Sequence, residues 1–172
     1  FFYTQVLACL QPVYLKKDVD FFPENNKLYL LIVLDGEQVI LNIPSEHLNR
    51  FYSVQAGDRQ YVVFLDDIIK MNLPRIFKNA AIEGCYSIKI TRDAELELEA
   101  EYEGDVAKKI EKQLGKRDFG LATRFLYEPG LPARHLQTLI DTLKLQHAMV
   151  VEGGCYHNLK DLAGFPVQDR PL

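Results

Sequence analysis

The chain has 172 residues, of which 48% are hydrophobic and 26% charged, a balance typical of a soluble globular protein rather than a disordered one. No apolar run approaches the roughly 18 residues that span a bilayer, which excludes an integral membrane segment. The formal net charge of -4 argues against an indiscriminate nucleic-acid binder, so a polyanion would have to find a local basic patch.

The first third of the chain predicts strands. Residues 27–34 are rich in Leu, Ile and Val, the pair Asp35-Gly36 is a strong turn signal, and residues 38–43 form a second apolar run, so we expect a hairpin. A short helical turn is expected at 44–46, followed by a third strand at 60–64.

The central part predicts a helix and then a long strand. Asp66 or Asp67 can cap a helix that ends near Phe77 and contains Pro74, which should kink or restart it. Residues 84–98 are typical of a strand whose apolar register reverses near Arg92 and Asp93. Such a reversal often means a bulge, and bulges gather near functional surfaces, but an internal salt bridge is the default explanation of these charges.

The second half alternates strands and helices. A helix capped by Asp105 is expected before a strand at 121–127, and a second helix starts with Pro132 at its first position, before a final strand at 148–151. Together these elements favour the α+β class, as a two-layer sandwich with a largely antiparallel or mixed sheet and helices packed on one face. We expect one domain over 1–166 and a linker to a following domain over 167–172.

The stretch 153–161, GGCYHNLKD, gathers the most chemistry. Cys155, His157 and Asp161 could act as thiol nucleophile, base and orienting carboxylate. The structural alternative, which we favour, is a glycine turn followed by Asn158 as the N-cap of a short helix.

Metal and nucleotide sites find little support in the sequence. Cys155 and His157 could offer two metal ligands, but structural zinc needs four, so we expect no metal site. The remaining Cys and His residues show no paired spacing: Cys9, Cys85, His47, His135 and His147. The nucleotide fingerprints GxxxxGK[ST] and GxGxxG are missing, and the widely spaced cysteines are typical of a reducing cytoplasm.

A basic helix is the weaker candidate for a polyanion site. Its cations are Lys108, Lys109, Lys112, Lys116 and Arg117. Such a stripe could follow a phosphate chain, although the solvated face of a surface helix has the same composition.

Several stretches in order resemble the middle, or head, domain of bacterial polyphosphate kinase of the first family. They are FYTQVLACLQPV (2–13), LDDIIKMNLPRIF (65–77), YSIKITRDAELEL (86–98) and VEGGCYHNLKDLAGF (151–165). The resemblance covers nearly the whole chain and is most specific in ITRDAEL and GGxYHNxKD. Cys155 departs from the family pattern, which commonly has Arg there.

The resemblance implies a parent enzyme that reversibly transfers the terminal phosphate of ATP to inorganic polyphosphate, with Mg²⁺, through a phosphohistidine in another domain. It implies no catalytic residue and no cofactor in this chain, and a cytoplasmic protein with membrane association left open. It also implies that this domain packs against other domains of the same polypeptide, supports a dimer or tetramer and brackets the polyphosphate tunnel. The candidates for these contacts are Lys89, Arg92, Asp93, Tyr156, His157, Asn158 and Lys160.

Two other functions stay open at this point. One is a free-standing module that captures an acidic polymer through the basic helix at 108–117. The other is a small thiol enzyme that uses Cys155.

Overall fold

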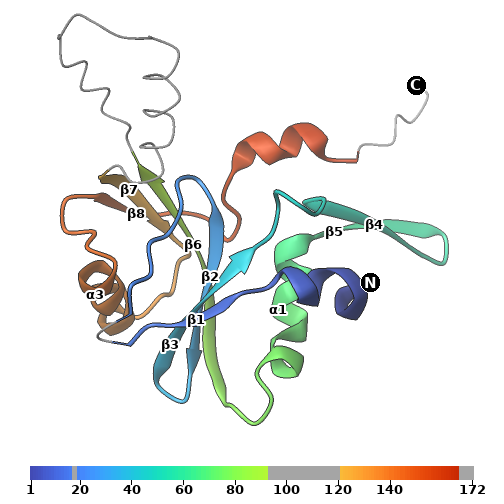
Figure 1. Cartoon of the computed structure of the whole chain (residues 1–172). Coiled ribbons are helices and arrows are strands. Elements are labelled where there is room, and N and C mark those ends of the chain that lie inside the picture. The colour runs from blue at the N-terminus through green and yellow to red at the C-terminus, as the bar shows by residue number, and fades with distance from the viewer. Residues whose placement is uncertain (17–18, 93–120, 167–172) are drawn as a thin grey trace, which may run out of the picture.

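A computed structural model describes residues 1–16, 19–92 and 121–166. Its main feature is a six-stranded sheet with the strand order β1-β3-β2-β6-β7-β8, accompanied by a two-stranded sheet of β4 and β5 (Figure 1). The strands are β1 (Pro12–Tyr14), β2 (Leu28–Leu34), β3 (Glu37–Ile43), β4 (Phe51–Ala56), β5 (Arg59–Phe64), β6 (Ile82–Arg92), β7 (Ala122–Tyr127) and β8 (Met149–Glu152).

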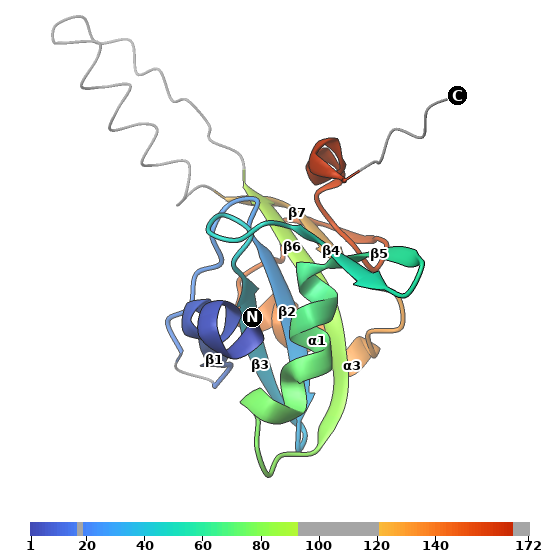
Figure 2. The same cartoon turned by 90° about the vertical axis from the view of Figure 1, so that its right-hand side faces the viewer.

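Helices cover both faces of the large sheet. These are the N-terminal segments η1 (Phe2–Val6) and η2 (Leu7–Cys9), then α1 (Leu65–Ile76) and α3 (Ala133–Thr142). The 3₁₀ segment η4 (Leu159–Gly164) lies apart from the sheet, and none of its residues belongs to either core (Figure 1). Figure 2 shows η1 and α1 in front of the sheet, with α3 behind it. Among the described residues, no helix is long and apolar enough to cross a membrane.

The composition of β2 explains why both faces are covered. Leu28, Leu30 and Ile32 pack with α1 in one core, whereas Tyr29 and Leu31 pack with α3 in the other. Because side chains alternate across a strand and every residue of β2 is apolar, each face of this strand must be buried. The predicted α+β class and mixed sheet are confirmed, but the helices lie on two faces rather than one, so the fold has three layers.

The β2–β3 hairpin is confirmed. Its turn places Asp35 at φ 47° and Gly36 at φ 79°, the left-handed region that an Asp-Gly pair tolerates well. The predicted helical turn after it is also present, since the amides of His47 and Leu48 both donate to the carbonyl of Pro44.

The β4–β5 hairpin projects beside the start of α1 (Figure 1). Its second strand was predicted, but its first strand was not. Helix α1 begins at Leu65 as a direct continuation of β5, and Phe64 takes the N-cap position without a side-chain hydrogen bond. The prediction that Asp66 or Asp67 caps this helix is therefore wrong.

Strands β6, β7 and β8 lie where the sequence predicted strands, and they differ from the prediction only at their ends. A register shift between Thr91 and Arg92 confirms the predicted break in register in β6. Strands β7 and β8 pair in parallel because α3 crosses between them, and Pro132 is the N-cap of α3 rather than its first residue. Residues 93–98 of the predicted long strand, and the helix expected after Asp105, lie outside the described residues.

Candidate functional site

The closing loop, residues 153–161, follows β8 and folds back over the large sheet. The amide of Gly153 donates to the Tyr127 carbonyl at 2.8 Å, which extends the β7–β8 pairing by one residue. A Cβ at Gly153 would lie 3.0 Å from Cε1 of His157, so glycine lets the imidazole pack directly against the backbone. Asn158 then adopts φ 64° and leads the chain into η4.

His157 is an internal anchor of this loop. Its side chain is buried, and Nε2 donates to the Ser87 carbonyl oxygen of β6 at 3.2 Å. Burial lowers the pKa of His157, which keeps the ring neutral. The imidazole thus joins the loop to the sheet through one hydrogen bond.

The possible triad of Cys155, His157 and Asp161 is not assembled. The His157 ring is directed at Ser87, and Asp161 Oδ2 accepts a hydrogen bond from Arg50 Nη1 at 3.2 Å. A base and its orienting carboxylate must bond to each other to activate a nucleophile, and here each has another partner. The geometry therefore favours the structural interpretation of this loop.

Arg50 is the residue that sequence reasoning missed. Its guanidinium is buried and bridges two carboxylates, donating to Asp66 at 2.8 Å and to Asp161 at 3.2 Å. It also reaches the His157 carbonyl oxygen at 3.5 Å. Burial raises the pKa of Asp66, and the charge of Arg50 opposes that rise. This buried ion cluster joins the closing loop to the start of α1.

Tyr156 attaches the loop to the β4–β5 hairpin. Its ring stacks on Phe64 with the ring centroids 4.0 Å apart, and its hydroxyl donates to Asp67 Oδ2 at 2.8 Å. Burial and then the Asp67 carboxylate raise the pKa of Tyr156 to about 12, so the hydroxyl keeps its proton as a donor.

A basic cluster of Lys89, Arg124 and Lys160 lies where the loop meets the sheet. Lys89 is half-buried, and its Nζ donates to Asn158 Oδ1 at 2.5 Å. Burial is the largest cause that lowers the pKa of Lys89; the charges of Lys160 and Arg124 lower it further, and Asp161 opposes them. Arg124 and Lys160 are exposed. Asn158 thus takes the predicted N-cap position, but its side chain binds Lys89 instead of the helix.

Arg92 lies apart from this cluster. Its side chain is buried, Nε donates to the Pro23 carbonyl at 3.0 Å, and the guanidinium stands 3.6 Å from the centroid of the Phe22 ring. The remaining candidates lie outside the described residues: Asp93, Lys108, Lys109, Lys112, Lys116 and Arg117.

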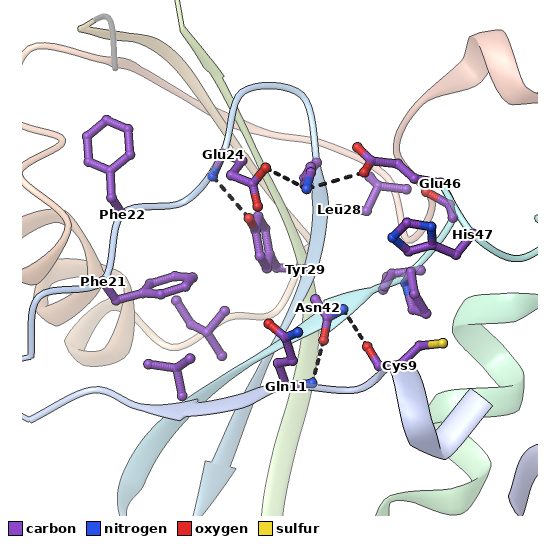
Figure 3. Close-up of a pocket in the computed structure, with 16 residues that line it drawn as sticks. Cys9, Gln11, Phe21, Phe22, Glu24, Leu28, Tyr29, Asn42, Glu46 and His47 are labelled. Atoms are coloured by element: carbon purple, nitrogen blue, oxygen red, sulfur yellow. Dashed lines mark hydrogen bonds and ion pairs between the residues drawn. The ribbon is translucent and has the colours of Figure 1, made fainter. Parts of the chain in front are cut away.

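A hollow of about 290 Å³ lies beside Tyr29 (Figure 3). Its polar groups already have partners: Lys27 pairs with Glu24 and Glu46. Asn42 accepts from the Gln11 amide, just before β1, and donates to the Cys9 carbonyl of η2. Across the described ranges, no three His, Cys, Asp or Glu side chains are grouped so that they could hold a metal ion.

Comparisons with known proteins agree on one family. The polyphosphate kinase middle domain family matches residues 1–165. Polyphosphate kinase of Vibrio vulnificus strain YJ016 is 33% identical over all of this chain, and that of Escherichia coli K12 is 29% identical over 91% of it. These matches cover 27% and 25% of the two relatives.

A solved structure gives the same result. The crystal structure of polyphosphate kinase from Porphyromonas gingivalis superposes with a TM-score of 0.78 at 28% identity, covering 99% of this chain and 25% of that one. The chain thus spans about a quarter of the length of the relatives it matches.

Proposed function

Because the chain belongs to the polyphosphate kinase family, as its middle domain, we propose that it serves as the non-catalytic middle domain of a longer polyphosphate kinase. That protein would reversibly transfer the terminal phosphate of ATP to inorganic polyphosphate, with Mg²⁺, through a phosphohistidine. Among the described residues, no three His, Cys, Asp or Glu side chains are grouped to hold a metal ion, and the His157 ring is buried against the sheet. We therefore propose that the phosphohistidine and the Mg²⁺ ligands belong to other domains.

Within that enzyme, the basic cluster of Lys89, Arg124 and Lys160 would contact the polyphosphate chain. The supporting observation is the convergence of three cations from β6, β7 and η4, whose mutual repulsion contributes to the lowered pKa of Lys89. Asp161, the carboxylate that acts on Lys89, is already paired with Arg50. A phosphate chain would relieve the repulsion and accept charge-assisted hydrogen bonds.

The exposed apolar side chains of η4 favour a second role in domain packing. Leu159 is 75% exposed and Leu162 is 47% exposed, next to Phe165. Neighbouring domains of the same polypeptide, or a second subunit of a dimer or tetramer, would cover this surface. The setting of such an enzyme would be the cytoplasm.

The polyphosphate contact is tested in the longer protein with the double variant Arg124→Gln/Lys160→Gln. We expect the KM for polyphosphate to rise about tenfold with little change in kcat, because these contacts serve binding and not the chemical step. The rise should shrink as salt is added, since salt screens exposed charges.

The matched control is Arg59→Gln/Lys78→Gln, which removes the same two charges from exposed positions elsewhere. An equal rise in KM for both double variants would mean that net charge matters and the basic cluster does not. An unchanged KM in the test variant would reject the contact.

A further inference from the structure

A second hollow, of about 620 Å³, lies at the start of α3. Three distant segments build it: the end of β1 with residues 15–16, the β2–β3 turn with the start of β3, and the first turns of α3. It is separate from the basic cluster. Lys89 lies between Ile88 and Ile90, which pack on the α3 side, so Lys89 points to the opposite face of the sheet.

Gln38, one of the residues that line this hollow, has an unmatched buried group. Its side chain is 6% exposed, and its Nε2 donates to the His135 carbonyl at 3.1 Å and lies 3.0 Å from His135 Nδ1. Its Oε1 has no hydrogen-bond partner in the part of the chain that the structure describes. A buried acceptor without a donor costs about 1–3 kcal/mol, so a ligand donor would be favoured here.

The ring of His135 is approached by donors on both sides. Arg134 Nε donates to Nε2 at 3.1 Å, while Gln38 Nε2 faces Nδ1. Burial, and then the charge of Arg134, lower the pKa of His135, which keeps the ring neutral. Because a neutral imidazole accepts at one nitrogen and carries an N–H at the other, the ring N–H and one of the two N–H groups that face the ring lack an acceptor within this trio.

Reversing the Gln38 amide does not remove the mismatch. Oε1 would then accept from Nδ1, but it would also face the His135 carbonyl oxygen at the 3.1 Å now occupied by Nε2. The amide nitrogen would in turn take the buried position that has no partner. In the orientation described, Gln38 Oε1 is left without a donor, and the exposed Arg134 guanidinium has further N–H groups that can donate to a ligand.

Two exposed cations, Lys16 and Arg134, line the hollow, and Glu37 is the one carboxylate among its described lining residues. Glu83 also acts on His135, where its charge opposes the lowering of the pKa. Helix α3 begins here without a side-chain cap, so the positive end of its dipole and its first amides are directed toward this end.

We propose that this hollow binds an oxyanion of the phosphate class that carries a proton. Its oxygens accept from Arg134 and Lys16, and its P–OH donates to Gln38 Oε1. Free orthophosphate and the terminal group of a phosphate chain share this chemistry. Sulfate has a similar shape but no proton at neutral pH, so it is a poorer ligand.

The test follows amide hydrogen exchange of the peptide that spans the start of α3, in the longer protein, by mass spectrometry. Orthophosphate is expected to slow exchange there, and sulfate at the same ionic strength to slow it less. In Arg134→Gln, the concentration for half-maximal protection should rise about tenfold, as expected for the loss of a charge-assisted hydrogen bond. Lys16→Gln, at an exposed position that leaves the core intact, should shift the same midpoint in the same direction.

The control is Arg59→Gln, which removes an arginine charge from β5. Absence of protection by orthophosphate, or an equal midpoint shift in Arg59→Gln and Arg134→Gln, would overturn the site. Equal protection by sulfate would overturn the role of the proton and of Gln38.

Two further measurements separate the sources of the ligand and the two sites. Protection at lower concentrations of tripolyphosphate than of orthophosphate would identify a chain end as the ligand, and the reverse order would identify free phosphate. Protection should persist in Arg124→Gln/Lys160→Gln, because that variant alters only the opposite face of the sheet. Loss of protection in that variant would contradict a separate site.

Discussion

At the scale of single residues, the polar groups of the closing loop are mostly engaged within the chain. His157 binds Ser87, Asn158 binds Lys89 and Asp161 binds Arg50. A residue held in this way positions its neighbours more readily than it reacts, because its hydrogen-bonding capacity is already used. Lys160 is the polar candidate of this loop that remains exposed for a ligand or a neighbouring domain.

The buried pair of Arg50 and Asp66 leads to a stability prediction. Arg50→Met should destabilise this chain by about 3–5 kcal/mol at neutral pH, because it leaves the Asp66 carboxylate buried and uncompensated. Urea denaturation measures the loss. Lys78→Met, at an exposed position, should change the free energy of unfolding by less than about 0.5 kcal/mol.

The loss of stability in Arg50→Met should be larger at neutral pH than at low pH. Burial raises the pKa of Asp66, so the folded chain still holds the proton at pH 3.8, where the carboxyl group of the unfolded chain is already half deprotonated. The stability contributed by this proton is complete at low pH and is lost as the pH rises through the folded-state pKa. Without Arg50 that pKa rises further, so the deficit of Arg50→Met should be smaller at low pH than at neutral pH. A deficit that stays constant with pH would show that lost packing, and not the charge of Asp66, causes it.

Sequence reasoning located the closing loop but not its main partner. The glycine pair and Asn158 are local signals, and they correctly placed a turn and a short helix. Arg50 has no such signal, since it stands 16 residues from Asp66 and 111 residues from Asp161 along the chain. Asp66 resembles a helix cap in sequence, but its carboxylate serves a tertiary ion pair.

At the scale of elements, Tyr156 couples the closing loop to the β4–β5 hairpin. Tyr156→Ala should destabilise the docked loop by about 1–2.5 kcal/mol, through loss of the stack on Phe64 and of the hydrogen bond to Asp67. Tyr156→Phe keeps the stack, so it should cost about 1 kcal/mol.

Hydrogen exchange of the peptide that contains residues 153–161 measures this effect. Faster exchange is expected in Tyr156→Ala than in Tyr156→Phe, and Tyr61→Ala, an exposed tyrosine of β5, should leave this peptide unchanged. Equal exchange in the two Tyr156 variants would mean that the aromatic stack does not hold the loop.

Elements with strong local patterns were predictable, and those defined by pairing were not. The β2–β3 hairpin follows from an apolar run and an Asp-Gly turn. Strand β4 is mostly exposed and mixes polar with apolar residues, so only its pairing with β5 defines it. The sequence predicted helices on one face of the sheet, and the helix on the second face was missed. The apolar residues of β2 divide between two cores, but this division becomes visible only once the positions of α1 and α3 are known.

At the scale of the whole molecule, the two faces of the sheet carry different candidate sites. The α1 face bears the basic cluster and the closing loop, whereas the α3 face bears the hollow around Gln38 and His135. On η4, the apolar side chains of Leu159 and Leu162 are exposed. The domain-packing proposal therefore predicts that η4 is covered in the longer protein.

Labelling of an introduced thiol tests that prediction. In a Cys155→Ser background, Leu159→Cys should react with a maleimide more slowly in the longer protein than in the isolated chain, because a neighbouring domain or subunit shields η4. Met71→Cys on α1, where Met71 is 77% exposed, is the comparison position. Slowing at both positions would indicate general crowding, and equal rates at position 159 in the two proteins would show that η4 faces solvent. If the labelling of position 159 becomes faster when the longer protein is diluted, a second subunit shields η4, because only an intermolecular contact dissociates on dilution.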